Sequence, residues 1–479
     1  MENEILVENQ HLVNQEQEIR ELSYCFYLHA NGNSGSGKEI VIVVSGRYAG
    51  ESEELIGMQK LPAGVIDKSI CGCGLTSFAI EQERGNVVIA VPTQALVKNK
   101  VKQYPNKRYN SELFEVTGDT TAMDVAHFID DCEGRGVEWK VMVTYDSLWK
   151  LTTNNVLDRA HLIIDEWHMM NIWSGLKSDS RSAKNFQIDV MTRLLRIAKK
   201  YKDSVTFITA TPIALKYMAD WVGELNQVKL EWSVSVEEGP LYKVKDKKPI
   251  DFVKNKLINV IEKKGEVRIG EYECKKLIVF VNSIEAIKEM CNGVIDKEKC
   301  AIICGDKEVN DEKISSFAHR LEDPEELPRY TFVTSSGWQG IDLEDKEAVS
   351  VVISYGGDSS FHTLVDVNVQ LKQILGRQRD KENPSYHGGI FVYSDLAEEF
   401  INREKERLEE DANRVKNNLA VLELEDLLNE QRRDLKTSLM DLSLFRLFVN
   451  TKEDNPEGLE FNELYYKSKL YEIDEILPS

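Results

Sequence analysis

Long apolar runs are absent from this 479-residue sequence. No stretch of about 18 apolar residues occurs, so no membrane span is expected. The amino-terminal segment, MENEILVENQHLVNQEQEIRE, is acidic and polar, without the basic start and apolar core of a secretory signal. These absences predict a cytoplasmic protein, located in the host cytoplasm if the chain is viral.

Paired cysteines and histidines are also scarce. The eight cysteines form no CxxC pair, and only eight histidines occur. Zinc-ligand spacing is therefore missing, and reduced thiols in a cytoplasm are expected. Cys300 and Cys304 flank an apolar stretch, where small buried thiols are the simplest interpretation.

Positive charge is in deficit, because 60 Lys and Arg stand against 81 Asp and Glu, a formal net charge of −21. This balance argues against a broadly basic protein that coats nucleic acid. It leaves a local nucleic-acid track open, since backbone amides and hydroxyls can also hold phosphates. The length predicts about three domains.

The sequence does contain two series of short apolar stretches. The first is NVVIAVPT, KVMVTYD, HLIIDE and VTFITATP; the second is KKLIVFVNS, CAIICGD, RYTFVTSS, AVSVVISY and GGIFVYSD. Continuous apolar strands separated by amphipathic helices indicate parallel sheets covered on both faces. We therefore predict an α/β protein with two tandem domains.

The same pattern predicts the domain boundaries. Residues 1–60 are interpreted as an extension, 61–235 as the first domain and 250–397 as the second. The stretch 233–250 contains Gly, Pro and mixed charge, and is interpreted as a linker. Residues 398–479 carry Leu and Val at helical spacing. They predict helices packed on the two domains or, alternatively, a partner-binding coiled coil.

Two stretches compete as a phosphate-binding loop. GNSGSGKE at 32–39 matches GxxxxGK, but Glu39 replaces the magnesium-binding hydroxyl and a strand follows where a helix is required. We interpret it as a turn. GVIDKSICGCGLTS at 64–77 has the required context, an apolar stretch before it and a helix after it.

In this second stretch, Leu75 stands where such loops carry lysine. Lys68, six residues before Gly74, could swing its amine over the phosphates and replace it. The alternative is decay of the site, with weak ATP binding. Thr76 would supply a hydroxyl to Mg2+. The loop residues expected to bind nucleotide are Lys68, Gly72, Cys73, Gly74, Thr76 and Ser77.

The stretch LIIDEWH at 162–168 is an apolar strand that ends in acidic residues. Ligands of α/β enzymes bind at the carboxyl edge of parallel sheets. Asp165 would hold Mg2+, Glu166 would polarise an attacking water, and His168 would connect the nucleotide site with the facing domain.

Taken in order, these stretches resemble the motifs of superfamily 2 DExH-type helicases over about residues 60–395. The resemblance implies two RecA-like domains, ATP with Mg2+ in the cleft between them, and nucleic acid across both. It assigns coupling between domains to Thr209 and Thr211. It assigns nucleic-acid contacts to Pro92, Thr93, Thr144, Thr334 and Ser335.

In the second domain, the resemblance assigns nucleotide binding to Gly340 and Asp342, and catalysis to Gln373, Arg377 and Arg379. We favour Arg379 as the arginine finger; a surface salt-bridge pair is the alternative. The two arginines have GRxR spacing, which resembles some viral and phage helicases, including the herpesvirus origin-binding type. The loop pattern K-S-x-x-G-x-G-x-T resembles helicases of crAss-like phages.

The resemblance implies an ATP hydrolase that translocates along or unwinds nucleic acid, DNA rather than RNA, in viral or mobile-element replication or recombination. Replication or recombination proteins are the expected partners of the C-terminal helices. Three alternatives remain: an RNA helicase, a scaffold with a helicase fold that binds a protein partner, and the motor subunit of a restriction or defence complex.

Overall fold

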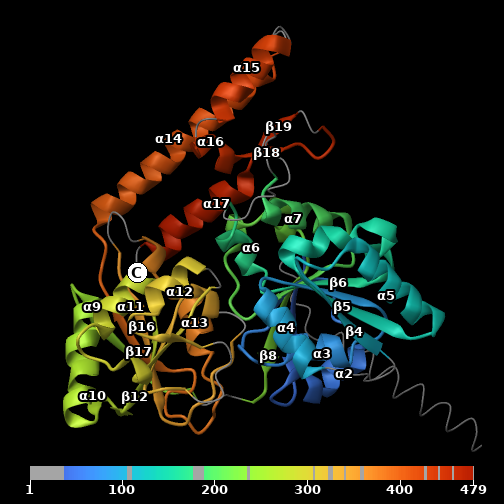
Figure 1. Ribbon diagram of the computed structural model, residues 1–479. Helices are drawn as coiled ribbons and strands as arrows, with labels where there is room; N and C mark the ends of the chain where they lie inside the picture. Colours follow the sequence, from blue (N-terminus) through green and yellow to red (C-terminus); the bar gives the residue numbers. More distant parts are fainter. Residues whose placement is uncertain are drawn as a thin grey trace, which may run out of the picture.

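The computed structural model describes residues 37–104, 111–175, 188–234, 238–305, 308–321, 327–338, 341–356, 361–424, 429–440, 443–455 and 458–477. They form two α/β lobes and a C-terminal region (Figure 1). We call residues 37–234 lobe 1 and residues 238–397 lobe 2.

Lobe 1 is built on a parallel sheet of eight strands in the order β1-β8-β2-β7-β6-β3-β5-β4. Successive apolar residues of one strand enter opposite cores, so Val88 packs in one cluster and Ile89 in the other. The strands are β1 (Glu39–Val44), β2 (Gly64–Asp67), β3 (Val87–Val91), β4 (Ser111–Val116), β5 (Glu138–Thr144), β6 (His161–Asp165), β7 (Thr206–Thr209) and β8 (Gln227–Trp232).

Lobe 2 repeats this design with seven parallel strands in the order β14-β13-β15-β12-β16-β17-β9. Val279 and Ile278 again face opposite cores. Cys300 is buried, as interpreted, whereas Cys304 is half-buried. The strands are β9 (Leu241–Lys245), β12 (Lys276–Phe280), β13 (Cys300–Ile303), β14 (His319–Arg320), β15 (Tyr330–Val333), β16 (Ala348–Ser354) and β17 (Gly389–Tyr393).

Helices cover both faces of each sheet, which confirms the predicted pair of α/β domains with the RecA-like arrangement. Lobe 1 carries α2 (Glu53–Met58), α3 (Leu75–Glu81), α4 (Gln94–Gln103), α5 (Ala122–Gly134), α6 (His168–Ile172), α7 (Val190–Lys200) and α8 (Asp220–Gly223). Lobe 2 carries α9 (Pro249–Phe252), α10 (Asn259–Lys264), α11 (Ile284–Cys291), α12 (Glu308–Ile314) and α13 (Gln370–Leu375), with the hairpin β10 (Val267–Ile269) and β11 (Tyr272–Cys274).

Two strands lie outside the domain limits expected from the sequence. β1 falls within residues 1–60, yet it pairs with β8 along its whole length. β9 falls within the expected linker 233–250 and pairs with β17 as the edge strand of lobe 2. Alternating exposure hides β9 in the sequence, because its pattern LYKVK has only every second residue half-buried.

The C-terminal region packs on the lobes, as expected for its helices. It consists of α14 (Glu398–Leu422), α15 (Asn429–Met440), α16 (Ser443–Phe448), α17 (Glu463–Tyr471) and the hairpin β18 (Val449–Thr451) and β19 (Leu459–Phe461). Apolar residues of α14 such as Leu408 and Val415 join the core of lobe 1.

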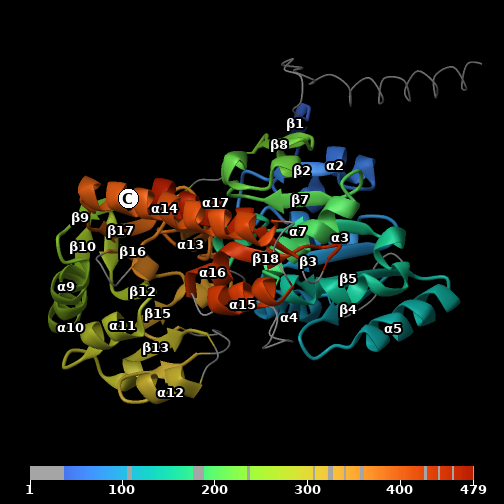
Figure 2. The same cartoon turned by 90° about the horizontal axis from the view of Figure 1, so that it is seen from above.

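Helix α17 spans the junction between the two lobes (Figures 1 and 2). Toward lobe 1, Lys467 Nζ lies 2.7 Å from Asp220 Oδ1. Toward lobe 2, the hydroxyl of Tyr471 donates to the buried carboxylate of Asp366. The helix therefore connects lobes whose sheets do not share a strand.

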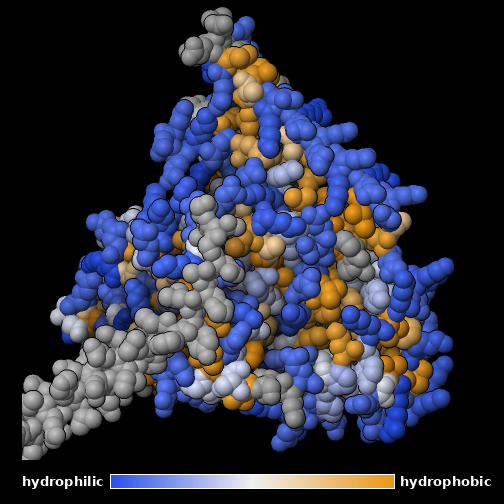
Figure 3. All heavy atoms as spheres, turned by 180° about the vertical axis from the view of Figure 1, so that it is seen from behind, coloured by the Kyte–Doolittle hydropathy of each residue, from blue (hydrophilic) through white to orange (hydrophobic). Residues whose placement is uncertain are grey.

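The surface is mostly polar. Figure 3 shows apolar side chains gathered on the projecting C-terminal arm, where Val421 and Leu424 are exposed. Within the described ranges, no helix combines the length and apolar character that crossing a membrane requires.

Candidate active site

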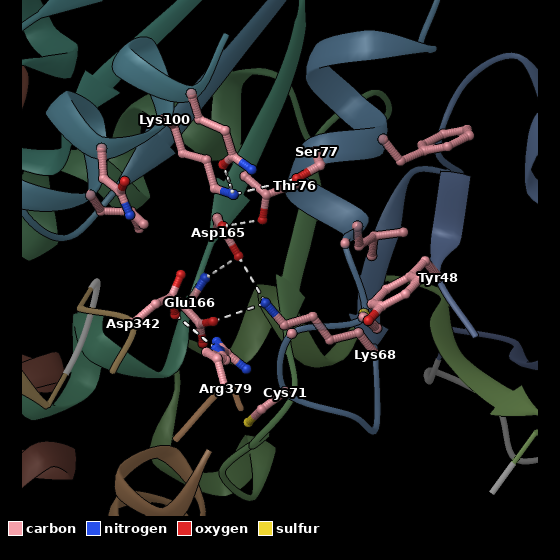
Figure 4. Close-up of a pocket in the computed structure, with 18 of the residues that line it drawn as sticks. Tyr48, Lys68, Cys71, Thr76, Ser77, Lys100, Asp165, Glu166, Asp342 and Arg379 are labelled. Carbon is pink, nitrogen blue, oxygen red and sulfur yellow. Dashed lines mark hydrogen bonds and ion pairs between the residues drawn. The ribbon is translucent and has the colours of Figure 1, made fainter. Parts of the chain in front are cut away.

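A cavity of about 530 Å³ lies between the lobes. Lobe 1 contributes the loop after β2, the start of α3 and one side of α4, and lobe 2 contributes Asp342 together with residues of α13 and of the segment after it (Figure 4). Because the lobe 1 strands are parallel, the ends of β2, β6 and β7 meet at this edge of the sheet. The side chains that follow these strands form the site.

The loop after β2 leads directly into α3, the context expected of a phosphate-binding loop. Gly72 and Gly74 have φ angles of 75° and 79°, a region that favours glycine. A Cβ on Gly72 would lie 2.3 Å from Nη1 of Arg379, so a larger residue would displace this guanidinium. The loop is therefore shaped by two glycines and closely covered by lobe 2.

The stretch 32–39, which the sequence context excludes as a phosphate-binding loop, is followed by a strand as expected. Glu39 begins strand β1, so no helix follows Lys38. Residues 32–36 of that stretch lie outside the described residues.

Lys68 turns into the cavity from the end of β2. Its Nζ lies 2.8 Å from Glu166 Oε1 and 3.2 Å from Asp165 Oδ1 (Figure 4). Burial opposes the charge on each group, but the carboxylates still raise the pKa of Lys68 above its ordinary value. Its ammonium in turn lowers the pKa of Glu166 to about 2 against the effect of burial. The amine thus pairs with both carboxylates of the acidic motif.

Leu75 is the residue in the usual lysine position. It is 1% exposed and packs in the apolar cluster that contains Ile66 and Phe78. The side chain therefore contributes to the core under the loop.

Thr76 and Asp165 form the part of the site that fits Mg2+. The Thr76 hydroxyl donates to Asp165 Oδ2 over 2.6 Å. Mg2+ is bound in proteins by one or two oxygen ligands together with water and substrate phosphates. A hydroxyl and a carboxylate in contact at the start of α3 match that requirement. Ser77 follows Thr76 and also lines the cavity.

Glu166 is held in an unusual backbone conformation, with φ of 56°. Such a conformation costs a non-glycine residue about 1–3 kcal/mol and persists only where neighbouring contacts enforce it. Gln373 of lobe 2 donates from Nε2 to Glu166 Oε2 at 3.1 Å and to Thr211 Oγ1 at 3.0 Å. Lobe 2 therefore contacts the acidic motif of lobe 1 directly.

His168 lies behind Glu166 and is fully buried. Thr209 Oγ1 donates to Glu166 Oε2 at 3.1 Å and lies 2.8 Å from His168 Nδ1. These distances favour a neutral ring with its proton on Nδ1. Nε2 has no partner among the described residues. Burial lowers the pKa of His168 to about 4.

Arg377 and Arg379 follow α13, which ends at Leu375. Arg377 is buried, and its Nη2 donates to Gln373 Oε1 at 3.1 Å. Arg379 Nε donates to Asp342 Oδ1 at 2.8 Å, beside the Gly72 loop. Both arginines line the cavity. The alternative of a surface salt-bridge pair does not fit this placement.

Gly340 lies outside the described residues. Cys73 is buried in the apolar cluster beneath the loop, so it presents its backbone rather than its thiol.

The residues expected to contact nucleic acid do not form one surface. In lobe 1, Pro92 lines the interlobe cavity, Thr93 caps α4 by accepting from Leu96 N, and Thr144 is 3% exposed. In lobe 2, the Thr334 hydroxyl contacts Ser336 Oγ at 3.1 Å. None of these four side chains lines the second cavity described next.

A second cavity of about 690 Å³ lies where both lobes meet α17. Ser335 lines it together with His168 and Gln373, and Gln373 also lines the first cavity. Trp173, Trp338 and Tyr471 add aromatic surface. One cavity thus lies on each side of the Glu166–Thr209–His168 contacts.

The residues of the first cavity that were missed in the sequence include Tyr48, Lys100, Lys381 and Tyr386. Tyr48 precedes the expected first domain, and Lys381 Nζ lies 5.2 Å from the centre of its ring. These residues follow no motif, so only the folded chain brings them to the site.

Neither a family model nor a curated protein matches the sequence. Solved structures of similar arrangement exist. They include Mycobacterium smegmatis helicase Lhr bound to ssDNA and AMP-PNP, 14% identical with a TM-score of 0.42 over 73% of this chain and 46% of that one.

Two further similar structures are E. coli DExH-box NTPase HrpB and S. cerevisiae Dbp5 bound to RNA and ADP BeF3. HrpB is 13% identical, with a TM-score of 0.41 over 73% of this chain and 41% of its own. Dbp5 is 12% identical, with a TM-score of 0.42 over 73% and 83%. The chain therefore spans less than half of Lhr and of HrpB. Residue roles rest on the site itself.

Proposed function

We propose that the protein is an ATP hydrolase that couples hydrolysis to movement along, or unwinding of, nucleic acid. One observation carries the proposal: Gln373 of lobe 2 bonds Glu166 at the point where Lys68 and Thr76 reach the acidic motif. A site completed by both lobes can convert a change at the nucleotide into a change in lobe spacing.

Each group has a role that its position supports. The loop at Gly72 and Gly74 would bind phosphate oxygens through backbone N–H groups. Mg2+ bound at Thr76 and Asp165 would neutralise phosphate charge. Glu166, held by its contacts with Lys68 and Gln373, would orient and polarise the attacking water.

Arg379 is the better candidate for the arginine finger. Its guanidinium lies against the phosphate loop, whereas that of Arg377 is bonded back to Gln373. Arg379 would stabilise charge on the transferred phosphoryl group from the opposite lobe. Asp342 holds it in place at 2.8 Å.

The second cavity is the candidate path for a single strand. It offers hydroxyl groups such as Ser335 for phosphates and aromatic rings such as Trp338 for stacking with bases. His168 and Gln373 border it. Gln373 Nε2 donates to Glu166 Oε2, and His168 connects with Glu166 through the hydroxyl of Thr209. A strand in this cavity would contact His168 and Gln373, which connect with Glu166 at the nucleotide site.

DNA is the proposed substrate, in replication or recombination of a virus or mobile element, on the GRxR spacing of the arginines alone. The test is ATP hydrolysis by the full chain with single-stranded DNA, single-stranded RNA or neither. We expect hydrolysis stimulated more by DNA, and abolished in Glu166→Gln. Stronger stimulation by RNA would reassign the substrate. No stimulation above the Glu166→Gln level by either would refute the motor.

A further inference from the structure

Lys100 reaches the interlobe cavity from α4, a helix that carries three lysines at alternate positions. Lys98 and Lys102 are exposed, whereas Lys100 is half-buried and lines the cavity. Residues two apart on a helix point to nearly opposite sides. The helix therefore turns one lysine of the three toward the phosphate loop (Figure 4).

The contacts of Lys100 are with neutral groups. Its Nζ lies 3.3 Å from Ser77 Oγ and 2.9 Å from Gln103 Oε1. Among the described residues, no carboxylate lies within ion-pair distance of this amine. Ser77 belongs to the first turn of α3, so the Lys100 ammonium lies beside the N-terminus of that helix, directly after the loop.

Lys68 differs in this respect, because both carboxylates of the acidic motif already pair with its amine. A half-buried ammonium without an anionic partner is costly unless a ligand supplies the charge. Burial accordingly lowers the pKa of Lys100, although Asp342 and Asp165 oppose this effect.

The charge balance of the cavity indicates what ligand fits. Five basic and five acidic side chains line it, so its formal charge is near zero. Three of the acidic ones are Asp165, Glu166 and Asp342, and each pairs with Lys68 or Arg379. Lys100 thus adds positive charge that the nearby carboxylates leave unpaired, at a site open to a polyanion.

We propose that Lys100 contacts the nucleotide, with its ammonium binding phosphate oxygens from the α4 side while Lys68 approaches from the β2 side. Ser77 and Gln103 would hold the amine in position before the ligand arrives. The inference rests on the proposed nucleotide site and adds a residue that the motif series does not contain.

The test is binding of ATP and of inorganic tripolyphosphate to the full chain in the presence of Mg2+. Lys100→Met should weaken both by roughly tenfold or more, the effect of one charged contact. Lys100→Arg should retain most of the affinity because it keeps the charge. Lys98→Met, on the exposed side of the same helix, should bind like wild type. Tripolyphosphate lacks the base and ribose, so weaker binding of tripolyphosphate by Lys100→Met would show that Lys100 contacts the phosphates.

Two results overturn the inference. If Lys100→Met binds tripolyphosphate like Lys98→Met, Lys100 makes no phosphate contact, while the nucleotide site itself stands. If the wild type binds neither ligand, the proposed function falls and this inference with it. Thermal unfolding without ligand separates the contact from a packing role, because Lys100→Met should unfold within a few degrees of Lys98→Met.

Discussion

Single residues determine the shape of the loop and the contacts at the proposed nucleotide site. Gly72 and His168 are the most informative positions. Gly72 combines a positive φ angle with close approach of Arg379, and His168 combines full burial with a hydrogen bond to Thr209. At this scale, substitutions separate the cost of a backbone conformation from the loss of a contact.

Gly72→Ala should reduce ATP hydrolysis far more than stability. The new Cβ would lie 2.3 Å from Arg379 Nη1, so the guanidinium must move away from the loop. The positive φ alone costs about 1 kcal/mol. Gly85→Ala is the matched control, because Gly85 has φ of 83° with nothing within 4 Å of its Cβ position. Urea unfolding should show similar losses for both, and hydrolysis a loss only for Gly72→Ala. Equal activities would refute the contact.

His168 should make the protein less stable in acid. Its pKa is about 4 when folded and 6.5 at the ordinary value, so the folded chain binds fewer protons between these limits. The free energy of unfolding should therefore fall as pH drops from about 6.5 to about 4, by at most about 3 kcal/mol, and be unaffected by this group above pH 7.

The comparison for this prediction is His168→Asn, which cannot titrate and can still donate to Thr209. Urea unfolding at pH 7 and pH 5 should show a smaller decrease for this variant than for wild type. The same decrease in both proteins would mean that other groups cause it.

At the residue scale, the sequence predicted the acidic motif, the loop glycines and Lys68 as a group that the structure brings together. It could not identify Tyr48, Lys100, Lys381 and Tyr386. Their positions depend on which helix face turns inward and on how the lobes approach each other, and neither is encoded by local spacing.

Elements were predictable where burial is two-sided. Strands such as β6 and β7 are continuous apolar stretches, so their type and approximate place follow from composition. β9 escaped because only one face is half-buried. Helix α13 ends before Arg377 because Gln378 pairs with Leu343, a contact between segments far apart in the sequence.

Helix α17 contacts both lobes, and Tyr471→Phe should weaken its contact with lobe 2. The change removes the hydroxyl that donates to buried Asp366, while the backbone amides of Asn368 and Val369 remain. Losing one hydrogen bond to a charged group should cost about 2 kcal/mol in urea unfolding. Among the described residues, the hydroxyl of Tyr466 on the same helix makes no hydrogen bond to lobe 2, so Tyr466→Phe should change stability by less than about 0.5 kcal/mol. Equal effects would show that the bond does not stabilise the junction.

The whole molecule is strongly acidic, with a formal net charge of −21, and this should make the proposed binding of nucleic acid only weakly dependent on salt. Among the described residues, Lys469 is the single Lys or Arg that lines the second cavity, and it pairs with Glu472. Few counterions should be released on binding. The logarithm of the association constant for a single strand, plotted against the logarithm of the salt concentration, should then have a shallow slope, with a magnitude below about 3. A fluorescence titration at several salt concentrations measures it; a slope steeper than about −5 would place the strand on a basic surface elsewhere.

The central claim is that Lys68 supplies the positive charge to the nucleotide phosphates. The usual lysine would supply this charge from the position that Leu75 occupies. The most direct measurement is steady-state ATP hydrolysis by Lys68→Ala, with exposed Lys60→Ala as control and folding checked by circular dichroism. We predict a loss on the order of 100-fold or more for Lys68→Ala, none for Lys60→Ala, and no rescue by adding Leu75→Lys, whose side chain would enter the core. Hydrolysis by folded Lys68→Ala at the wild-type rate would contradict the account.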